Sequence, residues 1–264
     1  MSTLRFTSLV SAIADPFCTA LAHHLSARLA QPAEFVPGKT YGDREGLLDT
    51  QQVDLVWLCG LLYLHKLAAG QRLVPAVAPC MIGEEPPNQP WYYADIIVHA
   101  QSSYRTWAAL RGATWAYNEE ASFSGYQVVR AHLAQQQEFT PFFGECIRSG
   151  AHLQSIDLVR RGVADCAAID STVLQMLRSI DPLLLREIRT IVRLGPYPMP
   201  LWVFTERCDP AMQQPSCNLL TQMHEEPAGR NLLAAWQIAR FATVAAAEYE
   251  PLRIADEQAQ LLTW

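Results

Sequence analysis

Apolar residues follow two different periods along this chain. In some stretches they recur every three or four positions, as on one face of an α-helix, and Phe17, Leu21, Leu25 and Leu29 give the clearest example. Short apolar runs, which favour buried strands, lie between such stretches. Strands are predicted over residues 4–10, 34–36, 53–58, 73–80, 94–100, 113–117, 142–147, 164–169, 188–194 and 201–205. Helices are predicted between these strands, and residues 209–264 are predicted to form helices only.

The first predicted helix has a recognisable start. Asp15 and Pro16 stand directly before its apolar face. Aspartate is a favoured helix cap, and proline is favoured in the first helical turn. We therefore expect Asp15 to cap this helix.

Two proline-rich stretches divide the chain. They cover residues 84–90 (EEPPNQP) and 195–200 (GPYPMP). Strands separated by helices predict parallel sheets with right-handed crossovers. We expect an α/β protein of two lobes, each a mixed, mostly parallel sheet flanked by helices. Residues 1–93 plus 198–264 would form a discontinuous lobe I, and residues 94–197 an inserted lobe II. Two segments would join them as a hinge, with a small ligand bound between the lobes.

Composition excludes several classes of protein. The net charge of −6 argues against a nucleic-acid binder with a basic stripe. No apolar run approaches the ~18 residues of a membrane span. The seven cysteines show no zinc-site spacing, and scattered cysteines favour a reducing compartment. The first ten residues lack the apolar core of a secretory signal. We therefore expect a cytoplasmic chain, or a periplasmic one from which a signal has been removed.

Residues 119–126 (EEASFSGY) are the strongest candidate for a binding segment. They follow a predicted strand and open a predicted helix, where backbone N–H groups lack partners and carry partial positive charge. Ser122 and Ser124 add hydroxyl donors, Gly125 lets a ligand approach the backbone, and Tyr126 adds a phenol. Together they could cradle an anion. The alternative is a serine that merely caps its own helix.

Two further segments carry polar groups at predicted helix starts. His152 ends the Ser-Gly-Ala-His stretch at 149–152, and it could donate to an anion or simply lie at the helix start. Asp170 stands just past a strand end, where open α/β sheets place ligand contacts, although it could equally cap the next helix. No phosphate-binding glycine loop, nucleophile elbow or metalloprotease motif occurs, so no cofactor and no metal are expected.

The order of these segments resembles one known family. The motifs that carry the resemblance are YYADIIV at 92–98, LRG at 110–112, SFSG at 122–125, SGAH at 149–152 and GVADCAAID at 162–170. Over about residues 4–249 they resemble the phosphate, phosphite and phosphonate substrate-binding proteins of ABC importers, which have the type II periplasmic-binding fold. The resemblance implies a non-catalytic protein whose two lobes close around a small anionic ligand, phosphonate-like or phosphate-like, and that partners an ABC permease.

The resemblance also assigns roles to individual residues. Ser122, Ser124 and Gly125 match the anion loop of the family, and His152 matches the end of its Gly-Ser-His motif. Asp170 matches the acid that receives the polar head or amine of the ligand. Tyr41 and Tyr93 match two aromatic contacts. Phe123 departs from the family pattern, because it replaces a threonine hydroxyl and so suggests a less charged or more apolar ligand.

Two alternatives use the same fold. An enzyme related to chorismate dehydratases or to thiamine pyrimidine synthases would use His152 and Asp170 as acid and base. A metabolite sensor would report closure of its lobes to a signalling partner.

Overall fold

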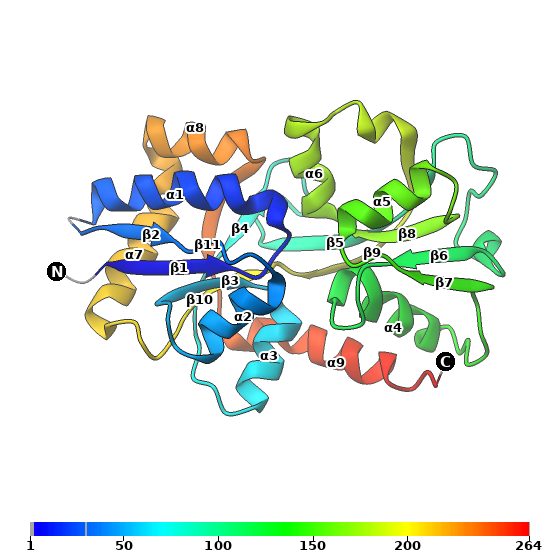
Figure 1. Cartoon of the computed structure of the whole chain (residues 1–264), viewed down its shortest axis with the longest axis horizontal. Helices are drawn as coiled ribbons and strands as arrows, with labels where there is room; N and C mark the ends of the chain where they lie inside the picture. The colour runs from blue at the N-terminus through cyan, green and yellow to red at the C-terminus, as the bar shows by residue number, and fades with distance from the viewer. Residues whose placement is uncertain (1–2, 30, 264) are drawn as a thin grey trace. The chain divides into compact units, whose positions relative to one another are not determined.

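The computed structural model describes residues 3–29 and 31–263, and they form two compact α/β units (Figure 1). The first unit comprises Met1–Trp91 and Pro198–Tyr249, and the second comprises Tyr92–Tyr197 and Glu250–Trp264. The expected lobe boundaries differ from this division mainly at the C-terminus. Residues 250–264 lie with the second unit, because α9 (Glu250–Ala259) packs along α4 (Val128–Gln135). The chain therefore passes between the units three times rather than twice.

The sheet of the first unit has six strands in the order β11-β4-β10-β3-β1-β2. Strand β1 pairs in parallel with β2 and β3, whereas β10 runs antiparallel to β3 and β4, and β11 antiparallel to β4. The mixed α/β architecture is confirmed, but antiparallel pairings outnumber parallel ones in this sheet. The strands span Leu4–Ser8 (β1), Ala33–Phe35 (β2), Leu55–Leu58 (β3), Val74–Met81 (β4), Leu201–Phe204 (β10) and Ile238–Thr243 (β11).

Strand β11 corrects the prediction that the chain is helical from residue 209 onward. Helix α8 (Pro227–Ala235) ends where Gln237 adopts a left-handed backbone with φ of 59°, and the chain then pairs with β4. Ile238 and Phe241 of this strand are buried. The alanine-rich run that follows α8 has no strong period, so its composition alone favoured a helix. Sheet pairing overrides that local preference.

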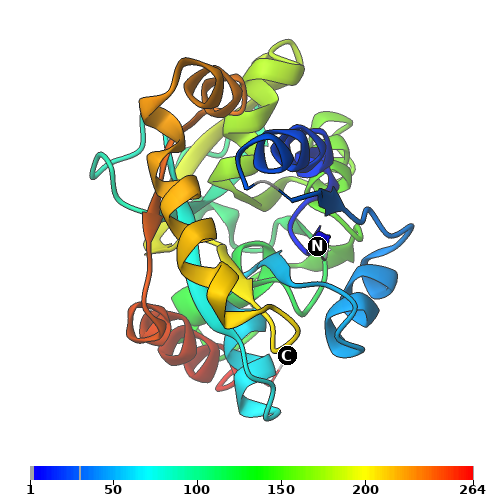
Figure 2. The ribbon, with the colours of Figure 1, turned by 90° about the vertical axis from the view of Figure 1, so that its left-hand side faces the viewer.

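The helices of the first unit are α1 (Asp15–Arg28), α2 (Tyr41–Asp49), α3 (Gly60–Ala68), α7 (Pro210–Gln222) and α8. Helices α1 and α8 contact each other, and α7 crosses β4 and β11 (Figure 2). The apolar face predicted for α1 is buried at Phe17, Leu21 and Leu25. Asp15 is the first residue of α1 and makes no cap hydrogen bond; the N-cap is Ala14. The expected capping role of Asp15 is therefore wrong.

The sheet of the second unit has five strands in the order β7-β6-β8-β5-β9. Strand β6 runs parallel to β7 and β8, and β5 runs antiparallel to β8 with Ala94 opposite Asp170. The strands span Trp91–His99 (β5), Thr114–Tyr117 (β6), Glu145–Arg148 (β7), Cys166–Asp170 (β8) and Ile188–Pro198 (β9).

Three helical segments follow the parallel strands of the second unit. A π-helical turn, η3 (Phe123–Gln127), precedes α4, where a single continuous helix was expected. Helix α5 (His152–Arg160) follows β7, and α6 (Ser171–Ile180) follows β8 directly.

Within the described ranges, no helix combines the length and apolar character needed to cross a membrane.

Candidate functional site

The candidate binding segments of the second unit meet at one edge of its sheet. Strands β6, β7 and β8 are parallel, so their carboxyl ends lie at the same edge. The antiparallel strand β5 begins at that edge, because Ala94 pairs with Asp170. Turn η3, the start of α5, the start of α6 and Tyr93 therefore come together. This edge carries all but one of the residues that the sequence analysis selected, the exception being Tyr41.

Ser122 acts as the N-cap of η3. Its Oγ accepts a hydrogen bond from the Gly125 N–H at 3.1 Å. The capping role that the sequence analysis gave as the alternative is thus present. Since a hydroxyl that accepts one bond still has its own proton to donate, this cap leaves Ser122 able to donate to a ligand.

Position 125 has no room for a side chain, because Asn118 lies against it. A Cβ at this position would lie 1.8 Å from Oδ1 and 2.7 Å from Cγ of Asn118. Asn118 follows β6 and is buried, and its backbone carbonyl accepts the Gly150 N–H at 2.8 Å. Asn118 therefore joins the loops after β6 and β7. Asn118 was not among the residues selected from the sequence, although its position as a polar residue at the end of a buried strand could have indicated a role.

Ser124 and His152 bring η3 and α5 into contact. The Oγ of Ser124 lies 3.3 Å from Nε2 of His152, and both side chains are at least nine-tenths buried, with 5% and 9% of their surface exposed. Burial lowers the pKa of His152 to about 4, and the Ala168 backbone opposes this shift only in part. The imidazole is therefore neutral at physiological pH.

This pair does not form a catalytic constellation. A serine nucleophile needs a histidine base that a third group orients. Nδ1 of His152 has no hydrogen bond of good geometry within the described part of the chain. A histidine with a pKa of about 4 is also a weak base at neutral pH. The geometry suits a fixed hydroxyl rather than an activated one.

The loop before α5 is held by its own polar contacts. The Ser149 N–H donates to the Tyr117 carbonyl at 2.8 Å, and its Oγ lies 2.6 Å from the Oγ of Ser155. The N-cap residue, Ala151, makes no side-chain cap bond. The first turn of α5 thus has no capping side chain, which leaves its positive end available to an anion.

Asp170 caps α6. Its Oδ1 accepts the backbone N–H of Thr172 at 2.8 Å and the Thr172 hydroxyl at 2.7 Å. The carboxylate is largely buried. The sequence analysis left the capping and ligand-binding roles equally open, and the capping role is the one that these contacts show.

Tyr93 lies at the start of β5, and the guanidinium group of Arg193 covers its ring. The guanidinium carbon of Arg193 is 4.0 Å from the centre of the Tyr93 ring, and Arg193 Nε donates to Asp95 Oδ1 at 2.8 Å. The Tyr93 N–H donates to Ser171 Oγ at 3.1 Å. Arg193 is a second residue that the sequence analysis missed, because nothing in its local sequence reveals the tyrosine opposite.

Phe123 and Tyr126 both point into packed surroundings. The ring of Phe123 is 1% exposed and meets Tyr197 edge-on at 4.8 Å. Tyr126 stacks on Trp115 at 5.5 Å and lies 4.8 Å from Tyr117. Phe123 therefore contributes a buried aromatic contact and no hydroxyl to the loop. Tyr126 belongs to an aromatic cluster next to the loop.

Tyr41 belongs to the first unit. It is the first residue of α2, follows β2, and is 41% exposed. Strands β1, β2 and β3 are parallel, so Tyr41 stands near the carboxyl edge of that sheet. The structure thus places it at the edge where α/β sheets bind ligands.

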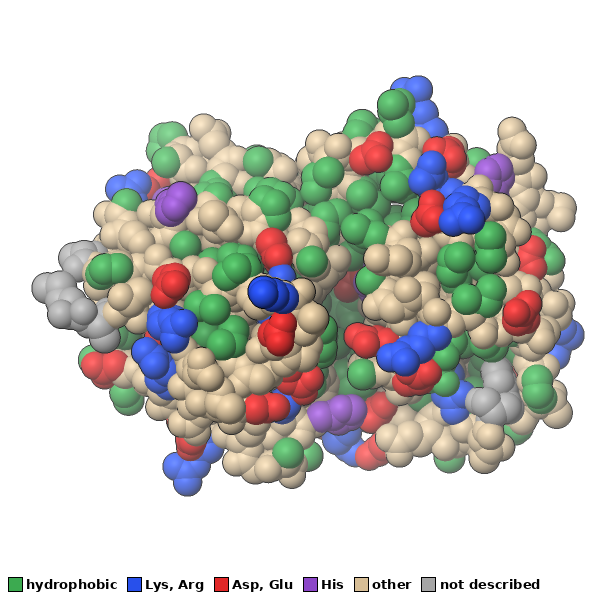
Figure 3. All heavy atoms as spheres, viewed as in Figure 1, with side chains coloured by type: hydrophobic (Ala, Val, Ile, Leu, Met, Phe, Trp, Pro, Cys, Tyr) green, Lys and Arg blue, Asp and Glu red, His purple; other side chains and the backbone are tan. Residues whose placement is uncertain are grey.

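The visible face of each unit carries charges of both signs (Figure 3). On the face shown in Figure 3, acidic and basic side chains are interspersed over each unit, without a large patch of one sign. The polar groups at the edge of the second sheet are mainly neutral donors and one capping carboxylate. The fold and this donor-rich edge place the chain in the class of ligand-binding proteins.

Comparison with known proteins identifies the family. The family of periplasmic substrate-binding proteins of phosphonate ABC transporters matches residues 16–249, so the chain belongs to it. No curated protein sequence matches the chain. The resemblance seen in the sequence is confirmed, and membership supports a solute-binding protein over the enzyme alternatives.

Solved structures agree with this fold. A binding protein component of an ABC phosphonate transporter from Pseudomonas aeruginosa superposes with a TM-score of 0.82 at 14% identity, covering 98% of this chain and 86% of that one. PhnD1 from Prochlorococcus marinus, in complex with methylphosphonate, gives 0.78 at 15%, covering 98% and 99%. XAC2383 from Xanthomonas citri, bound to ATP, gives 0.74 at 17%, covering 98% of both chains.

Proposed function

We propose that this chain binds a small phosphorus oxyanion, an alkylphosphonate or a phosphate-like anion, as the substrate-binding component of an ABC importer. The observation that supports this most is the meeting of η3, α5 and α6 at one sheet edge, joined by the Ser124–His152 contact at 3.3 Å. Helix starts and hydroxyls bind oxyanions without needing a net positive charge. The overall charge of −6 is therefore compatible with an anionic ligand.

The proposed ligand contacts divide by chemistry. Ser122 and Ser124 supply hydroxyl donors, Ser124 in the tautomer in which His152 Nε2–H donates to its Oγ. The backbone at the start of α5 supplies N–H donors, whereas the Gly125 N–H already donates to Ser122 Oγ, and Gly125 instead lets the ligand approach the backbone. His152 holds Ser124 in place. Asp170 would receive an amine or a protonated oxygen of the ligand, because a carboxylate can only accept hydrogen bonds. Aromatic contacts are assigned to Tyr41 and Tyr93, and Tyr126 supports the loop.

Phe123, which offers no hydrogen-bond donor, should make the proposed site favour ligands with fewer charged oxygens. An oxygen that loses its donor and stays unpaired costs about 1–3 kcal/mol. A ligand with one fewer charged oxygen, such as an alkylphosphonate or phosphite, avoids this cost. We therefore expect methylphosphonate and phosphite to bind more tightly than inorganic phosphate.

Thermal unfolding with a ligand panel tests the proposal. The panel contains methylphosphonate, phosphite, phosphate and sulfate, with ATP added because XAC2383 holds it. A ligand at 100 times its Kd stabilises the folded state by about 2.7 kcal/mol. We expect methylphosphonate to raise the Tm of the wild type but not that of Ser124→Ala. Ser216→Ala is the matched control, since Ser216 is a buried serine of the first unit whose Oγ has no hydrogen-bond partner among residues 3–29 and 31–263.

The proposed partner and location follow from the family, whose members are periplasmic components of ABC importers. We propose an ABC permease as the protein partner and the periplasm as the place of action, rather than the cytoplasm expected from the cysteines. Stimulation of the permease ATPase by the liganded protein in vesicles tests the first, and cell fractionation tests the second. A partner that binds only the liganded protein without being a permease would instead support the signalling alternative.

A further inference from the structure

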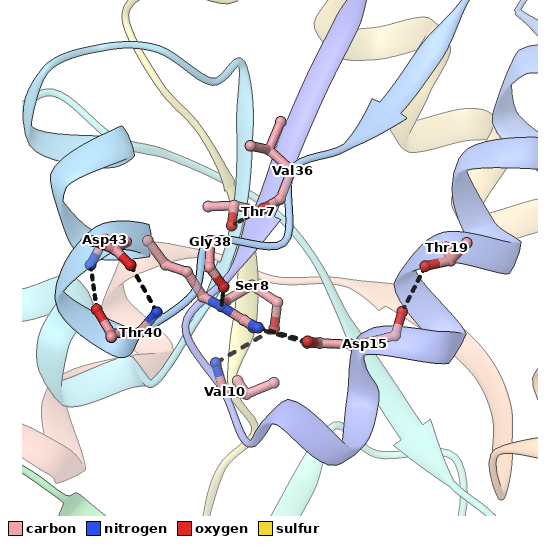
Figure 4. Close-up of polar contacts among 10 residues, drawn as sticks. Thr7, Ser8, Val10, Asp15, Thr19, Val36, Gly38, Thr40 and Asp43 are labelled. Carbon is pink, nitrogen blue, oxygen red and sulfur yellow. Dashed lines mark hydrogen bonds and ion pairs between the residues drawn. The ribbon is translucent and has the colours of Figure 1, made fainter.

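A partly buried ion pair, between a buried arginine and a half-buried aspartate, joins α2 to the start of α1 in the first unit. Arg44 on α2 and Asp15 at the start of α1 form two parallel hydrogen bonds, Nη1 to Oδ1 at 2.8 Å and Nη2 to Oδ2 at 2.5 Å. Figure 4 shows Asp15 together with Ser8, Gly38 and the Thr40–Asp43 pair around it. Only 9% of the Arg44 side chain and 26% of the Asp15 side chain are exposed. The sequence analysis assigned Asp15 to helix capping and gave Arg44 no role.

Arg44 also binds the two backbone segments that flank it. Its Nη1 donates to the Ser8 carbonyl at 3.2 Å, at the end of β1, and its Nε donates to the Gly38 carbonyl at 3.4 Å. Gly38 has a φ of 31°, and a Cβ there would lie 2.6 Å from Cγ of Arg44. The loop therefore lies against the arginine stem. Arg44 thus links the end of β1, the start of α1 and the loop before α2.

The same loop is fixed at both of its ends. Thr7 Oγ1 donates to the Val36 carbonyl at 2.7 Å. Thr40 and Asp43 form a capping box, with the Asp43 N–H donating to Thr40 Oγ1 at 3.1 Å and the Thr40 N–H donating to Asp43 Oδ2 at 2.8 Å. Tyr41 lies inside this box, directly after Thr40. Arg44 and the capping box together fix the backbone from which the exposed Tyr41 side chain projects.

Stability alone is a weak explanation for such a pair. Removing two charges from water costs several kcal/mol per ion, and apolar replacements of buried pairs are often neutral or stabilising. The bidentate geometry, by contrast, fixes orientation closely. A role in positioning explains why the pair ties together three segments, one of which, the loop before α2, leads directly into Tyr41.

We propose that Asp15 and Arg44 are positioning residues for Tyr41, holding its ring in the orientation that contacts the ligand. The inference rests on the proposed function, which assigns Tyr41 to the ligand. It adds residues that need not touch the ligand and that act through the loop between β2 and α2.

A double-mutant cycle tests the inference. Asp15→Asn/Arg44→Gln removes both charges while keeping polar side chains of similar shape, and Tyr41→Ala removes the aromatic contact. The Kd for methylphosphonate is measured by calorimetry for the wild type, each variant and their combination. We expect each change to weaken binding about tenfold and the combination to weaken it no further. Arg207→Gln is the control, because it breaks another Arg–Asp pair of the same unit, Arg207 with Asp54 at 2.9 Å.

The outcomes separate the two proposals. If the wild type binds no member of the ligand panel, the proposed function fails. If the wild type binds methylphosphonate but Asp15→Asn/Arg44→Gln has the same Kd, the positioning role is refuted. It is also refuted if Asp15→Asn/Arg44→Gln weakens binding by the same factor in the presence and in the absence of Tyr41. An unchanged Kd in Tyr41→Ala refutes it as well. Should the charge-free variant fail to fold, Arg44→Lys keeps the charge but loses the bidentate fork, and it must show the same coupling to Tyr41.

Discussion

Replacing Gly125 by alanine tests the packing of the proposed binding loop. The new Cβ would lie 1.8 Å from Asn118 Oδ1, 2.7 Å from Asn118 Cγ and 3.1 Å from Ser122 Oγ. Asn118 is 8% exposed, so its amide has little room to retreat. Overpacking of this kind costs about 1–3 kcal/mol. At 2 kcal/mol, a chain of this size would lose about 4–8 °C in Tm.

Calorimetric unfolding measures this loss of Tm. Two further variants show whether the clash with Asn118 causes it. Asn118→Ala removes the clashing atoms, so adding Gly125→Ala in that background should cost much less. Gly46→Ala is the control, because a Cβ there meets nothing within 4 Å, and alanine should stabilise the α2 helix by about 0.5–1 kcal/mol. If Gly125→Ala unfolds at the wild-type Tm, or costs the same with and without Asn118, this description of the loop is refuted.

Three other predictions follow from buried groups. The pKa of His152 is lowered from 6.5 to about 4 in the folded chain, so the unfolded chain binds the extra proton between these values, and stability should fall as the pH drops from 6.5 to 4. The loss should reach about 3 kcal/mol at pH 4 and should be absent from the stability–pH curve of His152→Gln, so the two curves should diverge below pH 6.5, whereas parallel curves would contradict the burial of the ring. Phe123→Thr should lower stability by about 2–4 kcal/mol, because it empties a buried site against Tyr197, while raising affinity for phosphate relative to methylphosphonate; unchanged denaturant midpoints would contradict the burial. All seven cysteines are free thiols, and only Cys146 is exposed, so a thiol reagent should label Cys146 first and Cys18 and Cys166 only on unfolding, as mass spectrometry of the labelled peptides would show.

Local patterns in the sequence predict much of this fold. The face of α1 follows directly from residue periodicity, because Phe17, Leu21 and Leu25 bury one side of the helix. The bounds of α6 were also predicted correctly, although its buried residues 173–177 lie on every side of the helix. The strand at Ile238–Thr243 could not be found in this way, since its pairing with β4 depends on residues more than a hundred positions earlier. The placement of α9 against α4 is likewise a long-range contact that no local pattern encodes.

The candidate site shows the same division. From the sequence, Ser122, Ser124, His152 and Asp170 were expected singly at helix starts or just past a strand end, and the structure adds that these positions share one edge of a sheet. The sequence did not show which partners these groups would meet inside the protein. Gly125 accommodates Asn118, and Phe123 packs on Tyr197. Such contacts join residues from different loops, and they decide which donors a ligand can reach.

A crystal structure of the protein with methylphosphonate tests the central claim most directly. We expect the phosphonate oxygens to lie within hydrogen-bond distance of Ser122 Oγ, Ser124 Oγ and the first backbone N–H groups of α5. Ordered methylphosphonate elsewhere on the chain, or none at a ligand concentration that saturates binding in solution, would contradict it.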